Sequence, residues 1–335
     1  MLFSSRSRPF FCFLKRPGWR WLLGALLLWG SAALPAVGQF RVRARKPAAS
    51  VPLPVPTQSS PLADPSVVRS QLFQAAALTN AFKDSEALAV YQEVLKTNPS
   101  HYLALWQAAV LSVKIGSRYT DETRQNAYFE AGRQYAERAL LLQPEGGESN
   151  YAVALAQFSQ ATLYWAGGRL SAFRDLRSHV YLAIEHRPDL PEAWQLLGRW
   201  QYRVAHYNLL ERLYSKLVLG GVPAGGDSRQ AMASLEKARE LAPQNLQVCY
   251  DLARMYHYQG RRRRAIAVLR AAERIPPLTG EDLVVSRLCR QMLPPLLRAD
   301  ARRQKRRAKL KENQVPAPRP TPDSTRVANP LIGKP

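Results

Sequence analysis

The feature of this sequence that most restricts its fold is a recurring pattern of small, bulky and proline residues, clearest in residues 246–277. The first half of that stretch has helical spacing, with Leu252, Ala253 and Tyr256 on one side, and Gly260 interrupts it. The second half runs small, bulky, small and proline at Ala265, Leu269, Ala272 and Pro277. Small residues belong where two helices touch, because close packing leaves room for little more than a methyl group. The stretch therefore predicts a helix-turn-helix unit.

The second-helix pattern occurs five times along the chain. Its copies are Ala87-Tyr91-Val94-Pro99, Gly132-Ala136-Ala139-Pro144, Leu176-Val180-Ala183-Pro188, Ala231-Leu235-Ala238-Pro243 and Ala265-Leu269-Ala272-Pro277. The prolines are 45, 44, 55 and 34 residues apart, and the last interval equals the tetratricopeptide period. The longer intervals predict inserted segments, among them a helix at 207–218 followed by a Gly-rich turn. We expect an all-α fold, a tetratricopeptide-type α-solenoid of about five helix-turn-helix units plus a capping helix, over residues 67–297.

The two ends of the chain differ from this repeat region. Residues 1–38 have five basic residues, then an apolar run at 21–34 and small residues up to Gly38, which is typical of an export signal. We expect cleavage near Gly38 and export to the periplasm or the extracellular space; the alternatives are a membrane anchor formed by residues 21–34 and an organelle presequence. Residues 39–66 form a Pro-rich linker. Residues 298–335 form a basic, largely disordered tail whose first part, to Lys311, is compatible with a helix.

The net charge of +23 lies mostly in those ends. Residues 67–297 carry 28 basic and 21 acidic residues, or +7, so the folded part is only mildly basic. Nucleic acid binding is therefore not favoured. The tail and the run of four arginines at 261–264 are either solvated or contact an anionic surface, with phosphate and acidic lipid as the obvious partners.

No catalytic or metal-binding constellation stands out. The five histidines are scattered, no HExxH or GxSxG motif occurs, and no cofactor motif is present. We expect no enzyme activity, no cofactor, no metal and no small-molecule substrate. Cys249 and Cys289 are interpreted as buried small hydrophobes, with a disulfide between them as the alternative; Cys12 falls in the leader.

Beyond the repeat, one ordered set of short motifs resembles a known family. It comprises Trp194, Leu197-Gly198-Arg199-Trp200, Glu211-Arg212, Leu219-Gly220, Ala231, Glu236-Lys237-Ala238, Leu241-Ala242-Pro243, Leu252-Ala253, Tyr256, Gly260, Ala265, Pro276-Pro277 and Glu281-Asp282. This order resembles the regulator of microtubule dynamics family, over residues 191–297 and more weakly over 67–190. The resemblance implies an all-helical adaptor without enzyme activity, whose eukaryotic members associate with microtubules and with mitochondrial or other membranes. The leader fits an exported bacterial relative with a different partner.

The first helices of such repeats line a concave groove, and eight side chains are candidates for that face. They are Gln195, Arg199, Tyr202, Arg203, Tyr250, Arg254, His257 and Tyr258. Arginine forks onto carboxylates and tyrosine offers rigid amphipathic area, so we predict a site for an acidic or carboxylate-terminated peptide. In the competing interpretation Arg199 pairs internally with an acid such as Glu236. Trp194 and Trp200 are assigned to packing.

The function predicted from the sequence is thus a non-catalytic scaffold that binds a protein or peptide partner, acidic partners included, through its groove. Two alternatives remain. The chain could be a membrane-anchored adaptor of the microtubule-regulator type, or it could bind a polyanion through its basic tail.

Overall fold

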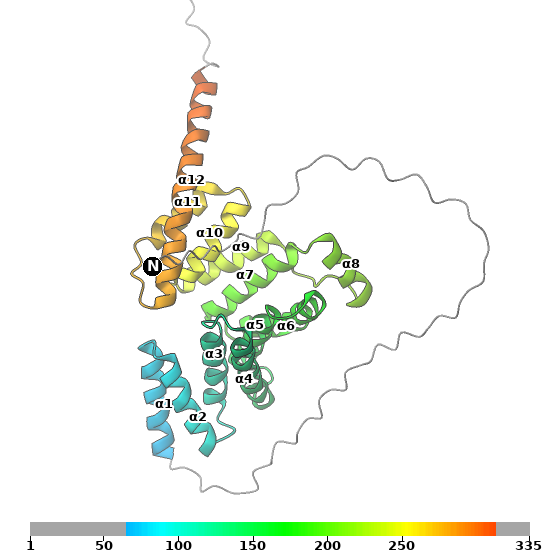
Figure 1. Ribbon diagram of the computed structural model, residues 1–335, viewed down its shortest axis with the longest axis vertical. Helices are drawn as coiled ribbons and strands as arrows, with labels where there is room; N and C mark the ends of the chain where they lie inside the picture. Colours follow the sequence, from blue (N-terminus) through cyan, green and yellow to red (C-terminus); the bar gives the residue numbers. More distant parts are fainter. Residues whose placement is uncertain (1–64, 313–335) are drawn as a thin grey trace, which may run out of the picture. The chain divides into compact units, whose positions relative to one another are not determined.

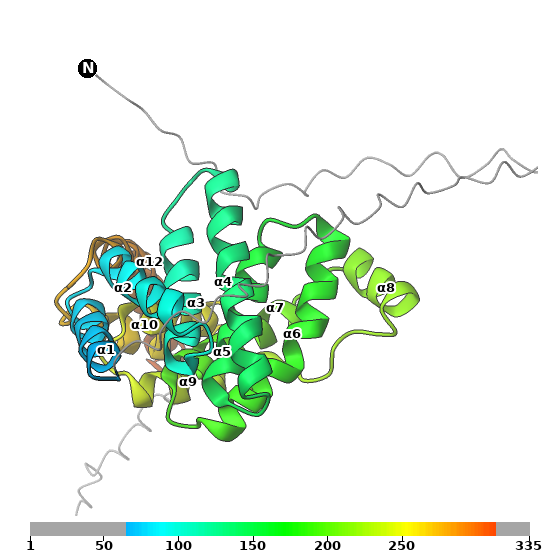
Figure 2. The same ribbon diagram turned by 90° about the horizontal axis from the view of Figure 1, so that it is seen from below.

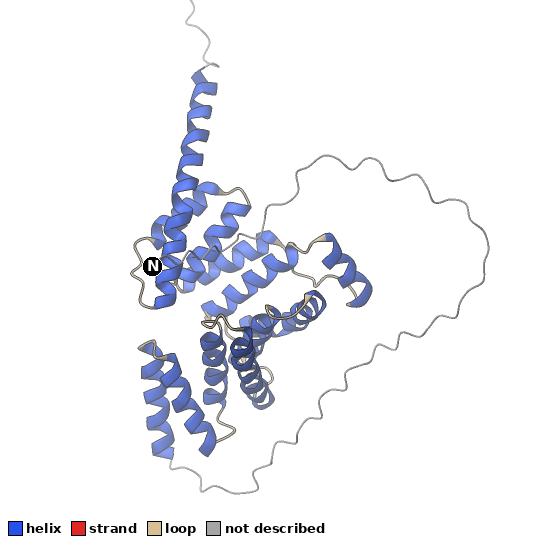
Figure 3. Ribbon diagram, viewed as in Figure 1, coloured by secondary structure: helices blue, strands red, loops and turns tan. Residues whose placement is uncertain are grey.

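The structure is a computed structural model that describes residues 65–312 of the 335-residue chain. Within that range every regular element is an α-helix, as predicted (Figure 3). The helices are α1 (Pro65–Asn80), α2 (Asp84–Thr97), α3 (Tyr102–Gly116), α4 (Glu122–Leu142), α5 (Gly147–Ala161), α6 (Ala166–His186), α7 (Pro191–Ala205), α8 (Leu209–Val218), α9 (Ser228–Leu241), α10 (Leu246–Tyr258), α11 (Arg262–Ala272) and α12 (Gly280–Glu312). The predicted leader, the linker up to residue 64 and the tail beyond 312 lie outside the described residues.

Five helix pairs make up the repeat region, and α12 covers the last of them. The pairs are α1 with α2, α3 with α4, α5 with α6, α7 with α9, and α10 with α11 (Figure 1). The α12 helix packs on both α10 and α11. The predicted solenoid of five units and a cap is confirmed. The long proline intervals are explained by α4 and α6, each of 21 residues, and by α8, which is inserted between the two helices of the fourth pair.

Small residues lie at the helix contacts, as the pattern predicted. A Cβ atom added to Gly198 on α7 would lie 2.8 Å from Leu235 Cγ and 3.1 Å from the Ala231 carbonyl oxygen on α9. The same arrangement recurs between α3 and α4, where a Cβ on Gly132 would lie 3.1 Å from the Ala109 carbonyl oxygen. The backbones of the paired helices are therefore too close for any larger residue at these positions.

The apolar core is divided into successive layers along the solenoid. Larger clusters are shared by α1 to α4, by α5 to α7 with Tyr207 just before α8, and by α9 to α12. Trp200 is the largest fully buried side chain, and its Nε1 donates to the Phe173 carbonyl oxygen at 2.7 Å. Its indole is therefore packed and its polar hydrogen is satisfied, in agreement with the assignment to the core.

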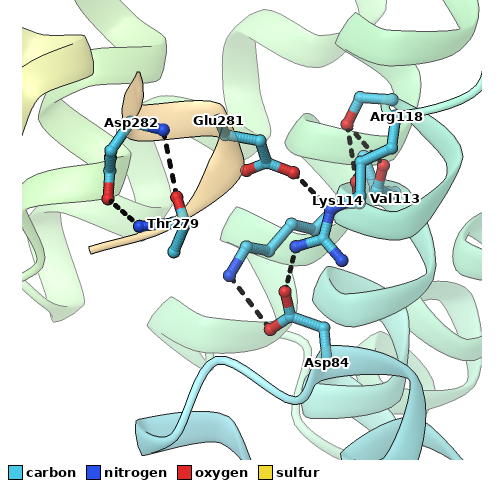
Figure 4. A network of polar contacts seen from close by, with 8 residues as sticks. Asp84, Val113, Lys114, Arg118, Thr279, Glu281 and Asp282 are labelled. Atoms are coloured by element: carbon cyan, nitrogen blue, oxygen red, sulfur yellow. Dashed lines mark hydrogen bonds and ion pairs between the residues drawn. The ribbon is translucent and has the colours of Figure 1, made fainter. Parts of the chain in front are cut away.

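One polar network joins an early unit to the start of α12 (Figure 4). The buried carboxylate of Asp84 accepts hydrogen bonds from Lys114, at 3.0 Å, and from Arg118, which also donates to Glu281. Asp282 begins α12 by accepting the backbone N–H of Thr279 at 3.1 Å. Because the Asp84 side chain is fully buried, its two cationic partners are needed to offset the loss of hydration.

The capping helix is longer than predicted. It continues through Pro294 and Pro295 and includes the basic stretch up to Glu312, which the sequence analysis had separated from it. Proline removes an N–H and leaves the carbonyl four residues earlier without a helical partner. Those carbonyls belong to Arg290 and Gln291, which are exposed, so that water can satisfy them.

Candidate peptide-binding groove

A hollow of about 300 Å³ lies where α5, α7 and α10 meet. It is lined by Phe158, Arg199, Tyr202, Gln247, Asp251, Arg254, Met255 and Tyr258. The side chains from α10 follow one another at helical spacing along a single stripe. Asn245 starts that helix by accepting the backbone N–H groups of Gln247, at 3.0 Å, and Val248, at 3.1 Å.

Asp251 is the polar centre of the hollow. Its Oδ2 accepts from Arg199 Nε at 2.7 Å and from Gln195 Nε2 at 2.9 Å, and its Oδ1 accepts from Gln247 Nε2 at 3.2 Å. The aspartate is only 8% exposed, so these donors replace the water that it has lost. The positive charge of Arg199 is therefore already paired within the protein.

The internal partner of Arg199 differs from the acid that the sequence analysis named. Glu236 instead accepts the hydroxyl of Tyr256 and lies 3.6 Å from Arg264. Asp251 is the carboxylate that reaches Arg199, because it lies on the stripe of α10 that faces α7. The interpretation in which Arg199 is paired internally holds, with Asp251 in the place of Glu236.

Arg203 points away from the hollow. Its Nη1 donates to Glu211 Oε2 at 3.2 Å and its Nη2 donates to Oε1, while its guanidinium carbon lies 5.2 Å from the centre of the Tyr207 ring. Burial raises the pKa of Glu211, but the hydrogen bonds from Arg203 and from the Asn208 backbone outweigh it, so that the net pKa is lowered. Arg203 therefore supports α8 and does not line the groove.

Arg254 is the exposed cation of the hollow. Within the described part of the chain, no carboxylate lies within ion-pair distance of it. Its guanidinium carbon lies 5.5 Å from the centre of the Tyr250 ring and 6.0 Å from that of Tyr258. Burial lowers the pKa of Arg254, but the combined effect of Tyr258, Tyr250 and Asp251 raises it by more. The net shift of the pKa is therefore upward, and the group stays charged. The arginine is thus held between two aromatic rings, one of which, Tyr258, also accepts a hydrogen bond from it, and it has no carboxylate partner among the described residues.

Aromatic side chains form the wall beside Arg254. The Tyr202 ring is stacked on Tyr258 at 6.2 Å between centroids, and it also lies 4.0 Å from the ring of His206. The His257 ring lies 5.7 Å from that of Tyr258. Burial raises the pKa of Tyr202, as does Tyr258, while Arg254 opposes them. The Tyr202 phenol therefore remains neutral, and the aromatic rings provide amphipathic surface.

The eight predicted groove residues therefore fall into three groups. Arg199, Tyr202, Arg254 and Tyr258 line the hollow, whereas Gln195, Tyr250 and His257 lie behind or beside it. Arg203, on α7, pairs with Glu211 of α8 and does not line the hollow. Whether any of them binds a peptide stays a prediction.

Four lining residues were not among the predicted candidates: Phe158, Gln247, Asp251 and Met255. Three of them lie on the α10 stripe, and the helical spacing from Gln247 to Tyr258 was a signal that could have found them. Phe158 comes from the preceding unit, and only the tertiary structure brings it there.

A second hollow, also of about 300 Å³, is rich in arginine. It is lined by Gly260 and Arg261 of the turn before α11, by Arg262, Arg263 and Arg264 of the first turn of α11, and by Asp300, Arg303 and Arg307 of α12. Asp300 lies 3.7 Å from Arg263 Nε, and Arg262 Nη1 donates to the Ala299 carbonyl oxygen at 3.3 Å. The arginine run and the basic tail, which the sequence analysis treated separately, thus share one site.

Residues 65–312 contain no cluster of three or more metal-ligating side chains. No helix in this range is both long and apolar enough to cross a bilayer. Cys249 and Cys289 are buried as predicted, and both are free thiols, so the alternative of a disulfide between them is wrong.

The helix pairs and the groove define an all-helical repeat scaffold of the tetratricopeptide type, a class whose fold suggests binding to other proteins. Residues 71–297 match the sequence profile of the family described as "Regulator of microtubule dynamics protein 1-3". Because this match covers more than half of the chain, the chain belongs to that family.

Individual relatives agree with this assignment. Regulator of microtubule dynamics protein 3 of Mus musculus is 28% identical over 181 residues, covering 53% of this chain and 38% of that protein. Protein 2 of Homo sapiens is 24% identical over 183 residues, covering 53% of this chain and 44% of its own length. The chain thus spans less than half the length of these relatives. Among solved structures, a thermophilic TPR protein of Thermus thermophilus is 17% identical, with a TM-score of 0.49 over 67% of this chain and 100% of that chain.

Proposed function

We propose that this chain is a non-catalytic scaffold that binds an acidic or carboxylate-terminated peptide segment of a partner protein in the groove between α7 and α10. The observation that carries the proposal is Arg254, an exposed arginine between tyrosine rings with no carboxylate of its own. A guanidinium held in this way can form two parallel hydrogen bonds to a carboxylate with little further loss of side-chain freedom.

The groove offers a different surface to each part of such a peptide. A carboxylate would meet Arg254, while apolar side chains would pack against Phe158, Met255 and the Tyr202 ring. Asp251 already accepts three hydrogen bonds, and its negative charge disfavours an acidic group of the peptide beside Arg199. We therefore expect a preference for one carboxylate with apolar neighbours over a run of acids.

The test is fluorescence anisotropy with labelled ten-residue peptides in which one carboxylate and one apolar residue are placed systematically. A charge-assisted hydrogen bond contributes about 1.5–3 kcal/mol, so Arg254→Ala should weaken the best peptide about 10- to 100-fold. Arg254→Lys should recover only part of this loss, because lysine keeps the charge without the fork. Arg229→Ala, at an exposed arginine on α9, is the matched control. Equal affinity of wild type and Arg254→Ala would rule the groove out.

A second candidate function is polyanion binding at the arginine-rich hollow, and the observation that favours it is the meeting of two basic runs at one place. Clustered cations bind phosphate groups with an affinity that falls steeply with salt. Sodium tripolyphosphate is a suitable probe for titration calorimetry. Arg303→Ala with Arg307→Ala should abolish its heat of binding, and Arg254→Ala should leave it unchanged; the reverse pattern would reject this candidate.

The location of the protein is a separate proposal that rests on the leader. We propose export with cleavage near Gly38, the alternative being retention through residues 21–34. Intact mass and fractionation of the native protein separate the two. A mature chain that begins at Gln39 supports export, and a full-length chain in the membrane fraction supports the anchor.

A further inference from the structure

The α8 helix stands apart from the repeat architecture. It is inserted between the two helices of the fourth pair and packs against α6, and it lies at the margin of the molecule in both views (Figures 1 and 2). Of its ten residues only Glu211 and Ser215 are buried. The helix therefore contributes little to the apolar core, and its presence calls for another explanation.

Polar contacts hold α8 in position. Asn208 and Glu211 form a reciprocal cap, with Glu211 N donating to Asn208 Oδ1 at 2.8 Å and Asn208 N donating to Glu211 Oε2 at 2.9 Å. Glu211 also receives the two hydrogen bonds from Arg203 on α7. The side of α8 that faces the protein is thus its polar side.

The opposite side of α8 is apolar and faces solvent. The side chains of Leu209, Leu210, Leu213 and Leu217 are 81%, 74%, 50% and 74% exposed. At about 100° per residue, the four leucines fall on one arc, away from Glu211 and Ser215. Soluble monomers rarely leave such a contiguous apolar strip uncovered.

Trp165 extends this strip. It is 74% exposed and precedes α6, and a Cβ atom added to Gly167 would lie 2.6 Å from its Cη2 and 2.8 Å from the Tyr214 hydroxyl of α8. The indole therefore lies beside the Tyr214 edge of the helix. The four leucines of α8 and Trp165 together form the α8 face.

Charge identifies what the α8 face fits. Arg212 and Lys216 are exposed along the edge opposite Tyr214, where Arg212 is held by donating from Nε to the Tyr207 carbonyl oxygen at 3.0 Å and from Nη2 to that of Ala205 at 3.4 Å. The sole carboxylate of α8, Glu211, is buried and paired with Arg203. A helix with leucines on one side, an aromatic residue beside them and basic residues at the edge is the type that lies in the headgroup region of a bilayer. A second copy of the chain is a poorer fit, because it would bring the same basic edges into one interface.

We propose that the α8 face is a membrane-contact surface for an anionic lipid bilayer. The leucines and Trp165 enter the boundary between headgroups and acyl chains, and Arg212 and Lys216 contact the lipid phosphates. This surface uses none of the residues that line the α7–α10 groove, so lipid and a peptide could be bound together.

The test places an environment-sensitive fluorophore on the α8 face in the full chain, in a Cys12→Ser background. The label is attached at Leu213→Cys, and Leu141→Cys on α4, where the native side chain is 82% exposed, is the matched control. Cys249 and Cys289 are buried and should not react. With vesicles of phosphatidylcholine and phosphatidylserine, the label at position 213 should shift to the blue and be quenched by nitroxide lipids, while the label at 141 should not respond.

Variants then test the two parts of the surface. Leu209→Glu and Leu217→Glu should each weaken vesicle binding about tenfold or more, because a leucine that enters the bilayer is replaced by a charge. Circular dichroism should show an unchanged fold, since both side chains are exposed. Pure phosphatidylcholine vesicles should bind more weakly than the mixture.

Two outcomes would overturn the proposal. If the chain binds vesicles but the label at 213 stays in water, other segments make the contact. If the label responds only to protein concentration, and Leu213→Glu converts a dimer to a monomer in sedimentation, the α8 face is an interface between two copies of the chain.

Discussion

Gly198 offers a sharp test of how α7 and α9 pack. An alanine Cβ would lie 2.8 Å from Leu235 Cγ, 3.0 Å from Leu235 Cδ2 and 3.1 Å from the Ala231 carbonyl oxygen, whereas unstrained carbon contacts lie near 3.5–4.0 Å. Leu235 is fully buried and the carbonyl is part of a helix, so neither can move freely. Overpacking costs about 1–3 kcal/mol, against about 1 kcal/mol gained from alanine's helix propensity. We expect Gly198→Ala to lower the free energy of unfolding by about 1 kcal/mol.

The assay is urea unfolding followed by circular dichroism, arranged as a double-mutant cycle. Leu235→Ala alone should cost about 2–5 kcal/mol. The double variant should lose about 0.5 kcal/mol or more less stability than the sum of the losses of the two single variants, because the smaller side chain at position 235 leaves room for the new methyl group. Gly168→Ala on α6 is the control, since its Cβ would meet nothing closer than 3.4 Å and should not destabilise. Additive effects of the two substitutions, or equal effects at both glycines, would refute the close approach of α7 and α9.

Three further predictions follow from the polar contacts and the thiols. Asp251→Asn should tighten binding of acidic peptides, because it removes a negative charge and frees Arg199; an unchanged peptide affinity would contradict this expectation. Asp251→Ala should lower the free energy of unfolding in urea by about 2–3 kcal/mol. The pKa of Glu211 is lowered in the folded state. The ionised group therefore contributes its full share to the free energy of unfolding above the unfolded-state pKa of about 4.3, and this share is lost as the pH falls through the folded-state pKa. The hydrogen-exchange protection factors of α8 should accordingly fall on acidification, and Glu211→Gln, unlike Glu240→Gln at the surface, should remove that pH dependence. The pKa of the Cys289 thiol is raised to about 11, mainly by burial and to a smaller degree by Cys249 and two carboxylates. Iodoacetamide at pH 8 should therefore modify Cys289 only in the unfolded chain. Fast alkylation of the native protein would show that the thiol is accessible.

The repeat architecture could be predicted because it depends on local spacing. The pattern Ala231-Leu235-Ala238 places small and bulky residues on one side of a helix, and that side must meet a neighbouring helix wherever the chain folds. Gly198 fits the same reasoning, because it lies where two backbones approach each other. The class of fold and its units therefore followed from the sequence.

The details of the sites could not be predicted in the same way. Arg199 has several acids within reach along the chain, and only the rotation of α10 decides that Asp251 is its partner. The leucines of α8 have the spacing of a core helix, but the capping box and the Arg203 pair turn its polar side inward. The helix α12 also continues past Pro294, and the residues whose carbonyls lose a helical partner, Arg290 and Gln291, are exposed. These outcomes depend on contacts between distant parts of the sequence.

The central claim is that a peptide occupies the groove between α7 and α10. Hydrogen–deuterium exchange of the full chain, with and without the tightest peptide from the anisotropy screen, tests this most directly. The account predicts added protection in α7 and α10 around Tyr202 and Arg254, with none in α11 or α12. Protection confined to the arginines of α11 and α12 would contradict it and would make the polyanion site the centre of the protein's function.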